Sequence, residues 1–378
     1  NWNIYFSWYY FKSNQKKNKY MKKKILISTG GSGGHVIPAT VLYDHLKDDF
    51  DLFITLDNRG KSFLNLEKYN YTIINTPKLF SNIILFPLNI LLLVLSIFKS
   101  LFFLKKSGIN ILISTGGYMS LPLCISSLIL GIDIYLFEPN MVLGKSNRIF
   151  LKYSKKIFCY SSELLNYPKQ YLNKIIIIEP LLRKEFYSLK RDSSNQLNNE
   201  INLLIIGGSQ GAKLFDIELK SSLLRISKKY KLNIYQQANQ SNFKKLKDFY
   251  EKNSINYKIF NFEQNILKIS NNINLCITRA GASTLSELVF LNIPFLAIPL
   301  PSAKDDHQYQ NALQYKKKNC CWIIKQHELK NEVLINNLIN IIENKEDYLA
   351  KKKCMKEFSY KNSWNNINEK LIGIINEN

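Results

Sequence analysis

A chain of 378 residues is longer than one ordinary hydrophobic core needs and predicts two domains. Its content of 46% hydrophobic and 13% aromatic residues excludes a largely disordered protein. The formal net charge of +23 would draw the protein to nucleic acid, anionic lipid or phosphorylated ligands, although about half of this excess reflects a lysine-rich surface composition.

The N-terminal segment differs from the rest of the chain. Residues 1–20 mix aromatic residues with lysines and contain no signal-peptide cleavage site. Met21 is followed by a clean strand pattern. We therefore expect residues 1–20 to be an extension outside the fold.

From Met21 onward, short apolar runs alternate with amphipathic segments, a pattern typical of α/β proteins with parallel sheets. A polar stretch, Lys190–Glu200, predicts a linker between two series of strands. The expected strands are 25–28, 52–55, 72–74, 111–114, 134–137, 156–159 and 175–178, then 202–206, 233–236, 257–260, 275–278, 295–298 and 321–324. Two doubly wound, Rossmann-like domains follow, residues 21–182 and 183–355, with a C-terminal helix at 356–378 packing back on the first.

The segment Leu79–Phe98 has no charged residue over twenty positions and is long enough to span a bilayer. Asn82, Pro87 and nearby polar residues weaken that reading, and lysines follow at 99, 105 and 106. We favour a surface helix or helix pair that places an apolar face among lipid headgroups. A buried helix and a spanning helix are the alternatives.

The motif TGGSGGHV (29–36) follows the first expected strand. A strand, a glycine-rich turn and a helix starting near Pro38 would direct backbone N–H groups and the positive helix end toward a ligand. The pattern is not GxGxxG. Asp57 comes closest to the acidic residue of a dinucleotide site, but it lies in DNRG, after the second strand.

Glycine-bearing loops recur after three later strands, at 114–118, 206–212 and 278–287. In open α/β sheets, ligands bind beyond the carboxyl ends of the strands. Four such loops shared between two domains predict one ligand cleft between the domains.

Six motifs in a fixed order resemble the MurG family, the undecaprenyldiphospho-muramoylpentapeptide β-N-acetylglucosaminyltransferases of bacterial peptidoglycan synthesis. The similarity runs from about Met21 to the C-terminus, and the motifs are specific together although each is weak alone. The resemblance implies the GT-B fold. The motifs are GGSGGHVIPA (30–39), STGGYMSLP (114–122), EPNMVLGKSNR (138–148), GGSQGA (207–212), RAGASTLSE (279–287) and DDHQYQNA (305–312).

The resemblance also implies a reaction, an inverting transfer of N-acetylglucosamine from UDP-N-acetylglucosamine to the C4 hydroxyl of the muramoyl sugar of lipid I, which forms lipid II. It implies a peripheral enzyme at the cytoplasmic face of the cell (inner) membrane, with an anionic lipid surface as partner. The chain shows no aromatic–basic motif for nucleic acid, so none is expected as a partner.

By the family's motifs, the second domain binds the donor. Glu287 would accept hydrogen bonds from ribose hydroxyls, although it could be an exposed helix residue. The helix start at 282–286 would bind the diphosphate, and its hydroxyls could equally be N-caps. Asn311 is expected to be structural. The remaining donor contacts expected are Arg183, Ser209, Ala282, Ser283, Thr284, Leu285, Ser286 and Gln308.

In the first domain, the resemblance places Ser32, Gly33 and Gly34 over the donor sugar and diphosphate. Asn140 would contact the donor sugar or the acceptor, although the preceding Pro139 departs from the family's Glu-Gln-Asn pattern. His35 is the candidate general base, since neutral imidazole accepts a proton near pH 7. Glu138 is a competing base, and a simple backbone hydrogen bond is the alternative role for His35.

Metal chemistry lacks its usual signature. No Asp-x-Asp element lies at a strand end, and Asp305 and Asp306 are adjacent. We expect no required cofactor, with helix ends and Arg183 balancing the leaving-group charge, and leave dependence on a divalent ion open. The six cysteines have neither metal-site nor Cys-x-x-Cys spacing, which favours free thiols in a reducing cytoplasm.

Two other functions fit part of the sequence. Another GT-B transferase with a UDP-sugar donor and a lipid acceptor, such as diacylglycerol, would use the same second-domain motifs. A non-catalytic basic protein that binds membrane would explain the charge and the apolar segment. It would not explain the repeated glycine loops at strand ends.

Overall fold

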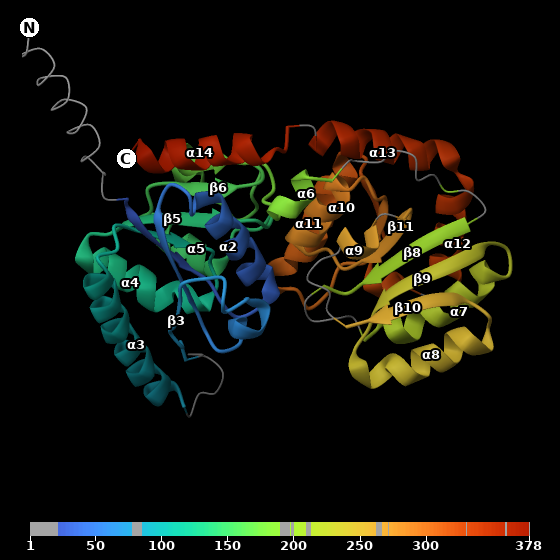
Figure 1. The fold of residues 1–378 in the computed structure, drawn as a ribbon, viewed down its shortest axis with the longest axis horizontal. Coiled ribbons are helices and arrows are strands. Elements are labelled where there is room, and N and C mark those ends of the chain that lie inside the picture. Colours follow the sequence, from blue (N-terminus) through green and yellow to red (C-terminus); the bar gives the residue numbers. More distant parts are fainter. Residues whose placement is uncertain are drawn as a thin grey trace, which may run out of the picture.

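The computed structural model describes residues 22–77, 85–189, 197, 200–208, 213–261, 267–270, 272–329, 331–359 and 361–377. The expectations for residues 1–20 and for most of the linker at 190–200 lie outside these ranges. Within them, the chain forms two α/β domains side by side (Figure 1).

The first domain is built on a seven-stranded, all-parallel sheet in the order β3-β2-β1-β4-β5-β6-β7. Its strands are β1 (Lys24–Ser28), β2 (Asp51–Leu56), β3 (Tyr71–Ile73), β4 (Ile111–Ser114), β5 (Asp133–Glu138), β6 (Ile157–Cys159) and β7 (Ile175–Ile177). Its helices are α2 (Gly33–Leu46), α3 (Phe86–Ser107), α4 (Leu121–Leu130) and α5 (Lys145–Phe150), and α6 (Lys184–Tyr187) leads to the second domain.

The second domain repeats this topology on a six-stranded parallel sheet in the order β10-β9-β8-β11-β12-β13. Its strands are β8 (Glu200–Ile206), β9 (Lys231–Gln237), β10 (Asn256–Phe260), β11 (Leu275–Thr278), β12 (Phe295–Ala297) and β13 (Cys321–Ile323). Its helices are α7 (Phe215–Ser227), α8 (Phe243–Lys252), α9 (Leu267–Ser270), α10 (Ala282–Phe290), α11 (His307–Lys317), α12 (Asn331–Glu343) and α13 (Lys345–Ser359).

Each sheet is buried on both faces, which explains why its strands are continuous apolar runs. In β1, Ile25 and Ile27 face one core cluster and Leu26 faces the other, as the two-residue period of a strand requires. Every strand expected from the sequence is present, with ends shifted by at most two residues.

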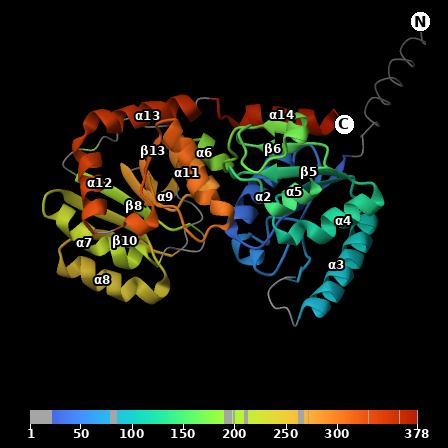
Figure 2. The same cartoon turned by 180° about the vertical axis from the view of Figure 1, so that it is seen from behind.

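The chain crosses back to the first domain at its C-terminus. Helix α14 (Trp364–Asn376) lies along the first domain, after α13 has covered the second (Figures 1 and 2). Its residues Ile367, Leu371 and Ile375 are fully buried in the first-domain core, and the Trp364 ring stacks on His45 at 3.7 Å between centroids.

The expected helix at 356–378 therefore has different bounds. Helix α13 continues to Ser359, and α14 begins only at Trp364. The break has a local cause, because the Ser363 side chain accepts a hydrogen bond from the Asn366 amide and caps the new helix.

Helix α2 also begins elsewhere than expected. The sequence places its start near Pro38, but the first helical residue is Gly33, and Pro38 lies inside the helix. Ser32 is extended and ends the loop, so that Gly33 and Gly34 form the first helical turn. Pro38, which lacks an N–H, falls in the second turn, where it leaves the Gly34 carbonyl without its helical donor.

Helix α3 covers the apolar segment and extends beyond it to Ser107, while residues 78–84 lie outside the described ranges. Among the described residues it is the helix long and apolar enough to cross a bilayer, with a mean hydropathy of 2.1. It packs on α4 at the outer edge of the first domain, away from the second domain (Figures 1 and 2). A spanning helix does not fit this topology, since the strands at its two ends, β3 and β4, belong to one sheet.

Candidate active site

A cleft of about 1320 Å³ lies between the two domains, where the carboxyl ends of both sheets meet. It is large enough for a nucleotide sugar together with part of an acceptor. Of the fifteen residues expected at the site, twelve line this cleft. They are Ser32, Gly33, Gly34, His35, Glu138, Asn140, Arg183, Ala282, Ser283, Thr284, Glu287 and Gln308.

The loop after β1 carries His35 to the cleft in the first turn of α2. The Nδ1 atom of His35 lies 3.0 Å from the Thr115 carbonyl oxygen. Because a carbonyl can only accept, Nδ1 carries the proton, and Nε2 of the neutral ring keeps its lone pair. Burial lowers the pKa of His35 below its ordinary value of 6.5, and the nearby His307 and Lys304 act in the same direction. The structure thus holds a neutral imidazole with a free acceptor nitrogen.

Glu138, at the end of β5, accepts hydrogen bonds through both carboxylate oxygens. Its Oε1 accepts from the amide and side chain of Asn140, at 3.3 and 3.0 Å. Its Oε2 accepts from the Gly144 amide and the Asn147 side chain, at 2.9 and 3.0 Å. Burial raises the pKa of Glu138, and these four donors oppose that shift. The carboxylate holds residues 139–147 in place through these four hydrogen bonds.

Asn140 connects the domains. Its Oδ1 accepts a hydrogen bond from the Asn311 side chain of α11 at 3.1 Å. Asn311 also accepts from the Met141 amide at 2.9 Å and donates to the Ala280 carbonyl at 3.2 Å. Asn311 is buried, and its amide bridges the two walls of the cleft.

Arg183 and Glu287 form an ion pair at the domain junction. An Nη2 donor of Arg183 lies 3.1 Å from Oε1 of Glu287, and the arginine also lies 5.2 Å from the centre of the Phe186 ring. Burial raises the pKa of Glu287, and the charge and hydrogen bond of Arg183 oppose this. Glu287 is therefore not an exposed helix glutamate, and part of the charge of Arg183 is already balanced.

Helix α10 begins at the cleft with Ala282, after the extended residue Gly281. The backbone amides of its first turn have no helical acceptor, and the helix dipole makes this end positive. No side chain caps this end, so Ser283 and Thr284 are not N-caps here. Leu285 and Ser286 do not line the cleft: Leu285 is fully buried, and Ser286 bonds the Ala282 carbonyl and the Tyr315 hydroxyl.

Gln308 has a fixed orientation. Its Oε1 accepts from the backbone amides of Ala280 and Leu300, at 3.2 and 3.0 Å. Because both partners are N–H donors, the side-chain atom that they contact must be the amide oxygen of Gln308. The two N–H groups on its Nε2 therefore remain available to a ligand.

Many residues of the cleft lining were not expected from the sequence, and two of them, Gln237 and Arg279, have defined hydrogen-bonding roles. Gln237, the last residue of β9, accepts from the Gly207 amide and donates to the Gly208 carbonyl, which fixes the glycine loop after β8. Arg279 is buried and donates to the carbonyls of Ile298 and Pro299 and to the side chain of Gln326. Burial lowers its pKa to about 10. A charged residue directly after an apolar strand was the available signal for Arg279, whereas Gln237 gave none.

Ser209, the remaining expected donor contact, lies outside the described residues. Asp305 and Asp306 belong to a short 3-10 helix, and the described residues contain no group of three or more His, Cys, Asp or Glu side chains placed to bind a metal.

Comparison with known proteins agrees with the two-domain division of this site. Residues 25–159 match the glycosyltransferase family 28 N-terminal domain, and residues 202–367 match the glycosyltransferase family 28 C-terminal domain. The chain is similar to the UDP-N-acetylglucosamine–N-acetylmuramyl-(pentapeptide) pyrophosphoryl-undecaprenol N-acetylglucosamine transferase of Pelagibacter ubique, with 54% identity over 95% of this chain and 100% of that protein. The protein of the same name from Rickettsia felis is 33% identical over 85% of this chain and 91% of its own.

The fold also matches a solved structure. The crystal structure of Acinetobacter baumannii MurG superposes with a TM-score of 0.73, at 21% identity, over 94% of this chain and all of that one. This match confirms the expected GT-B architecture.

Replacing Arg183 by methionine removes the cation beside Glu287, whose side chain is only 13% exposed. We expect the free energy of unfolding at pH 7 to fall by about 2 kcal/mol, less than the roughly 3–5 kcal/mol of a fully buried pair because Arg183 is partly exposed. The pKa of Glu287 would rise further, so the loss should shrink as the pH falls and the carboxyl becomes protonated. Urea unfolding at pH 7 and pH 5 measures both effects.

Arg225→Met is the matched control, because Arg225 pairs with Glu332 on the exposed surface. It should cost less than about 1 kcal/mol. Equal losses in the two variants would contradict a special role of the Arg183–Glu287 pair.

Proposed function

The chain belongs to glycosyltransferase family 28, and we propose that it transfers N-acetylglucosamine from UDP-N-acetylglucosamine to the C4 hydroxyl of the muramoyl sugar of lipid I, with inversion, to form lipid II. The observation that carries this proposal is the 54% identity to the Pelagibacter ubique transferase over that protein's entire length. The similarity includes the acceptor-facing first domain, which favours lipid I over diacylglycerol as acceptor.

The second domain supplies the donor site. Glu287 accepts hydrogen bonds from ribose hydroxyls, and the charge of Arg183 favours the charged form of that carboxylate against the effect of burial. The amides of Ala282, Ser283 and Thr284, at the positive end of α10, bind diphosphate oxygens. Gln308 presents its Nε2 donors to the transferred sugar.

The first domain supplies the acceptor side. Nε2 of His35 takes the proton of the acceptor C4 hydroxyl as its oxygen attacks the anomeric carbon of the donor sugar. The new bond joins that oxygen to the anomeric carbon, and the bond from the anomeric carbon to the diphosphate breaks. The electron pair leaves with UDP, whose charge is stabilised by the first turn of α10. Attack on the face opposite UDP gives inversion.

Transfer of labelled N-acetylglucosamine from UDP to a lipid I analogue tests the proposed reaction. We expect a product of the lipid II type and no transfer to diacylglycerol under the same conditions. UDP should raise the thermal unfolding midpoint, whereas an oligonucleotide should not. Transfer to diacylglycerol alone would overturn the acceptor assignment, and no stabilisation by UDP would overturn the donor assignment.

The general base is tested through His35. We expect His35→Ala to lower kcat by roughly 10²–10⁴-fold, because a positioned base contributes about that much, while the affinity for UDP stays unchanged. Since burial lowers the pKa of His35, the wild-type rate should begin to fall only below pH 6.5, where the ring becomes protonated. The pH dependence of kcat over pH 4.5–8 measures this.

His327→Ala is the control, because His327 is exposed and lies outside the cleft lining. This variant should leave unchanged both kcat at pH 7 and the fall of kcat at low pH. Near-normal turnover by His35→Ala with intact UDP binding would show that another group accepts the proton.

We infer that α3 docks the enzyme on the cytoplasmic leaflet, where the lipid acceptor lies. One face of the helix exposes large apolar side chains at a spacing of three and four residues, and Lys99, Lys105 and Lys106 flank it. The exposed residues are Leu88, Leu91, Leu95, Phe98 and Phe102, each 48–70% exposed. An apolar stripe beside lysines suits an anionic membrane surface.

The double variant Phe98→Asp/Phe102→Asp tests this docking. Each phenylalanine contributes about 1.5–3 kcal/mol when buried, so binding to vesicles containing phosphatidylglycerol should weaken at least about tenfold. Transfer to a water-soluble acceptor should persist. Ile217→Asp, at an exposed position in the second domain, is the control. Unchanged sedimentation of the double variant with vesicles would exclude α3 as the docking element.

A further inference from the structure

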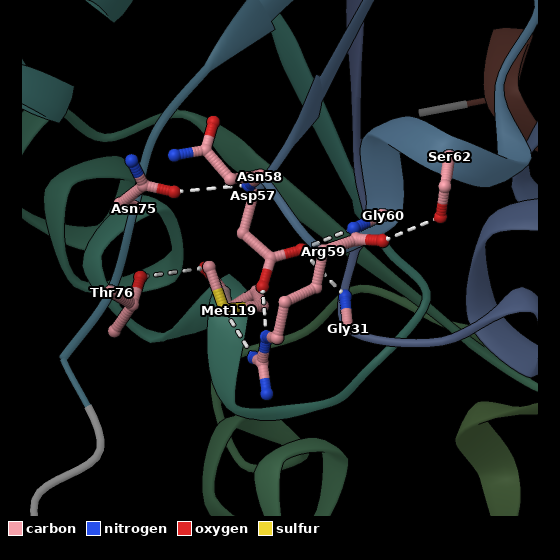
Figure 3. A network of polar contacts seen from close by, with 9 residues as sticks. All are labelled: Gly31, Asp57, Asn58, Arg59, Gly60, Ser62, Asn75, Thr76 and Met119. Carbon is pink, nitrogen blue, oxygen red and sulfur yellow. Dashed lines mark hydrogen bonds and ion pairs between the residues drawn. The ribbon is translucent and has the colours of Figure 1, made fainter.

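A buried carboxylate that the mechanism does not use lies directly after β2. Asp57 is 3% exposed, and its Oδ1 accepts hydrogen bonds from the backbone amides of Gly31 at 2.8 Å and Gly60 at 2.9 Å. Its Oδ2 accepts from Nε of Arg59 at 2.6 Å. Figure 3 shows the carboxylate between the glycine loop and the turn that follows β2.

The carboxylate fits against the backbone of the glycine loop. Gly30 and Gly31 have φ values of +149° and +81°, which residues with side chains rarely adopt. A Cβ on Gly30 would lie 2.9 Å from Oδ1 of Asp57 and would displace it. The glycines of this loop therefore serve the contact with Asp57 as well as any contact with a ligand.

The contacts extend to two further strand ends. Nη2 of Arg59 lies 3.4 Å from the sulfur of Met119, in the loop after β4, and Thr76, after β3, donates to the Met119 carbonyl at 3.4 Å (Figure 3). The loops after β1, β2, β3 and β4 are thereby joined around one ion pair. Gly31 directly precedes the cap of α2, and His35 follows four residues later.

The charge of Asp57 is balanced locally. Burial would raise its pKa, but hydrogen bonds from Gly31, Arg59 and Gly60 and the charge of Arg59 together hold it below its ordinary value. A bare carboxylate behind a loop that faces an anionic ligand would repel that ligand. Arg59 removes this repulsion while leaving the two glycine contacts in place.

The second domain contains a counterpart. Gln237, at the end of the equivalent strand β9, fixes the glycine loop after β8 through the Gly207 amide and the Gly208 carbonyl. In each domain, a side chain at the carboxyl end of the neighbouring strand thus contacts glycines after the first strand, a neutral amide in the second domain and a carboxylate–arginine pair in the first.

We propose that Asp57 is a positioning residue for the transfer reaction and that Arg59 shields its charge from the anionic acceptor that the proposed function assigns to the first domain. Asp57 fixes the loop that presents His35 and the first-turn amides of Gly33 and Gly34. The proposal rests on the proposed function for its substrate, but the ordering of the loop is a property of the chain itself.

Substitutions of Asp57 and Arg59 should change different kinetic parameters. Asp57→Ala leaves the Gly31 amide without an acceptor, whereas the Gly60 amide keeps the backbone carbonyl of residue 57 at 3.1 Å. We expect kcat to fall by roughly 10–100-fold while KM for UDP-N-acetylglucosamine stays within about twofold. Asp57→Asn keeps an oxygen for Gly31 and Gly60 and should recover part of that loss. Arg59→Met exposes the acceptor to the carboxylate charge, so KM for the lipid I analogue should rise about fivefold or more with kcat nearly unchanged.

A readout independent of activity is hydrogen exchange. Asp57→Ala should speed amide exchange in residues 29–36, and Asp133→Ala should not. Asp133 is the matched control, since it pairs with Lys155 at 3.3 Å at the opposite, amino end of the sheet. If Asp57→Ala does not fold, Asp57→Asn carries the same comparison with a smaller expected effect.

These experiments distinguish failure of the proposed transferase function from failure of the positioning role of Asp57. No transfer by the wild-type enzyme, with fast loop exchange in Asp57→Ala, would refute the proposed function and retain the ordering role. Normal kcat and normal amide exchange in Asp57→Ala would overturn the positioning role. A loss of kcat together with a loss of donor affinity and a lower thermal unfolding midpoint would indicate general destabilisation and would also overturn it. An unchanged acceptor KM in Arg59→Met would overturn the shielding role.

Discussion

The burial of α14 in the first domain is the constraint on which the cleft depends. Ile367, Leu371 and Ile375 complete the first-domain core although they follow the second domain in the chain. The chain therefore passes between the domains twice, near residue 183 and again between α13 and α14. Two crossings beside each other keep the carboxyl ends of both sheets turned toward a common space, and the Asn140–Asn311 contact joins the walls within it.

In both domains, a side chain at the end of the neighbouring strand fixes glycine residues that follow the first strand. In a parallel sheet, the loop after the first strand lies beside the end of the second strand, so a side chain there can fix the loop's backbone. Gln237 does this in the second domain and Asp57 in the first. Hydrogen bonds from its own domain fix the backbone of such a loop, so its ligand-facing groups keep one geometry before a ligand binds. This reduces the conformational entropy lost on binding.

Electrostatics in the cleft follow from its anionic substrates. The chain carries a large positive charge, yet two carboxylates lie buried near the site and a third, Glu287, is only 13% exposed. Glu287 is paired with Arg183, Asp57 with Arg59, and Glu138 accepts four hydrogen bonds from its own loop. Each carboxylate is thus neutralised or fully bonded at short range, so its structural use adds little repulsion toward diphosphate groups.

The sequence alone determined the thirteen expected strands and the order of the motifs, because a short apolar run between polar segments is a local signal that does not depend on its partners. It also located the loops that form the cleft, since parallel strands place their carboxyl ends on one edge. It misplaced the start of α2 and the bounds of the last helix, where the position of a capping residue decides the boundary. Only the tertiary structure paired Arg183 with Glu287, Asn140 with Asn311 and Asp57 with Gly31. Those contacts join residues 26 to 171 positions apart, and no local pattern encodes which distant groups folding will bring within hydrogen-bond distance.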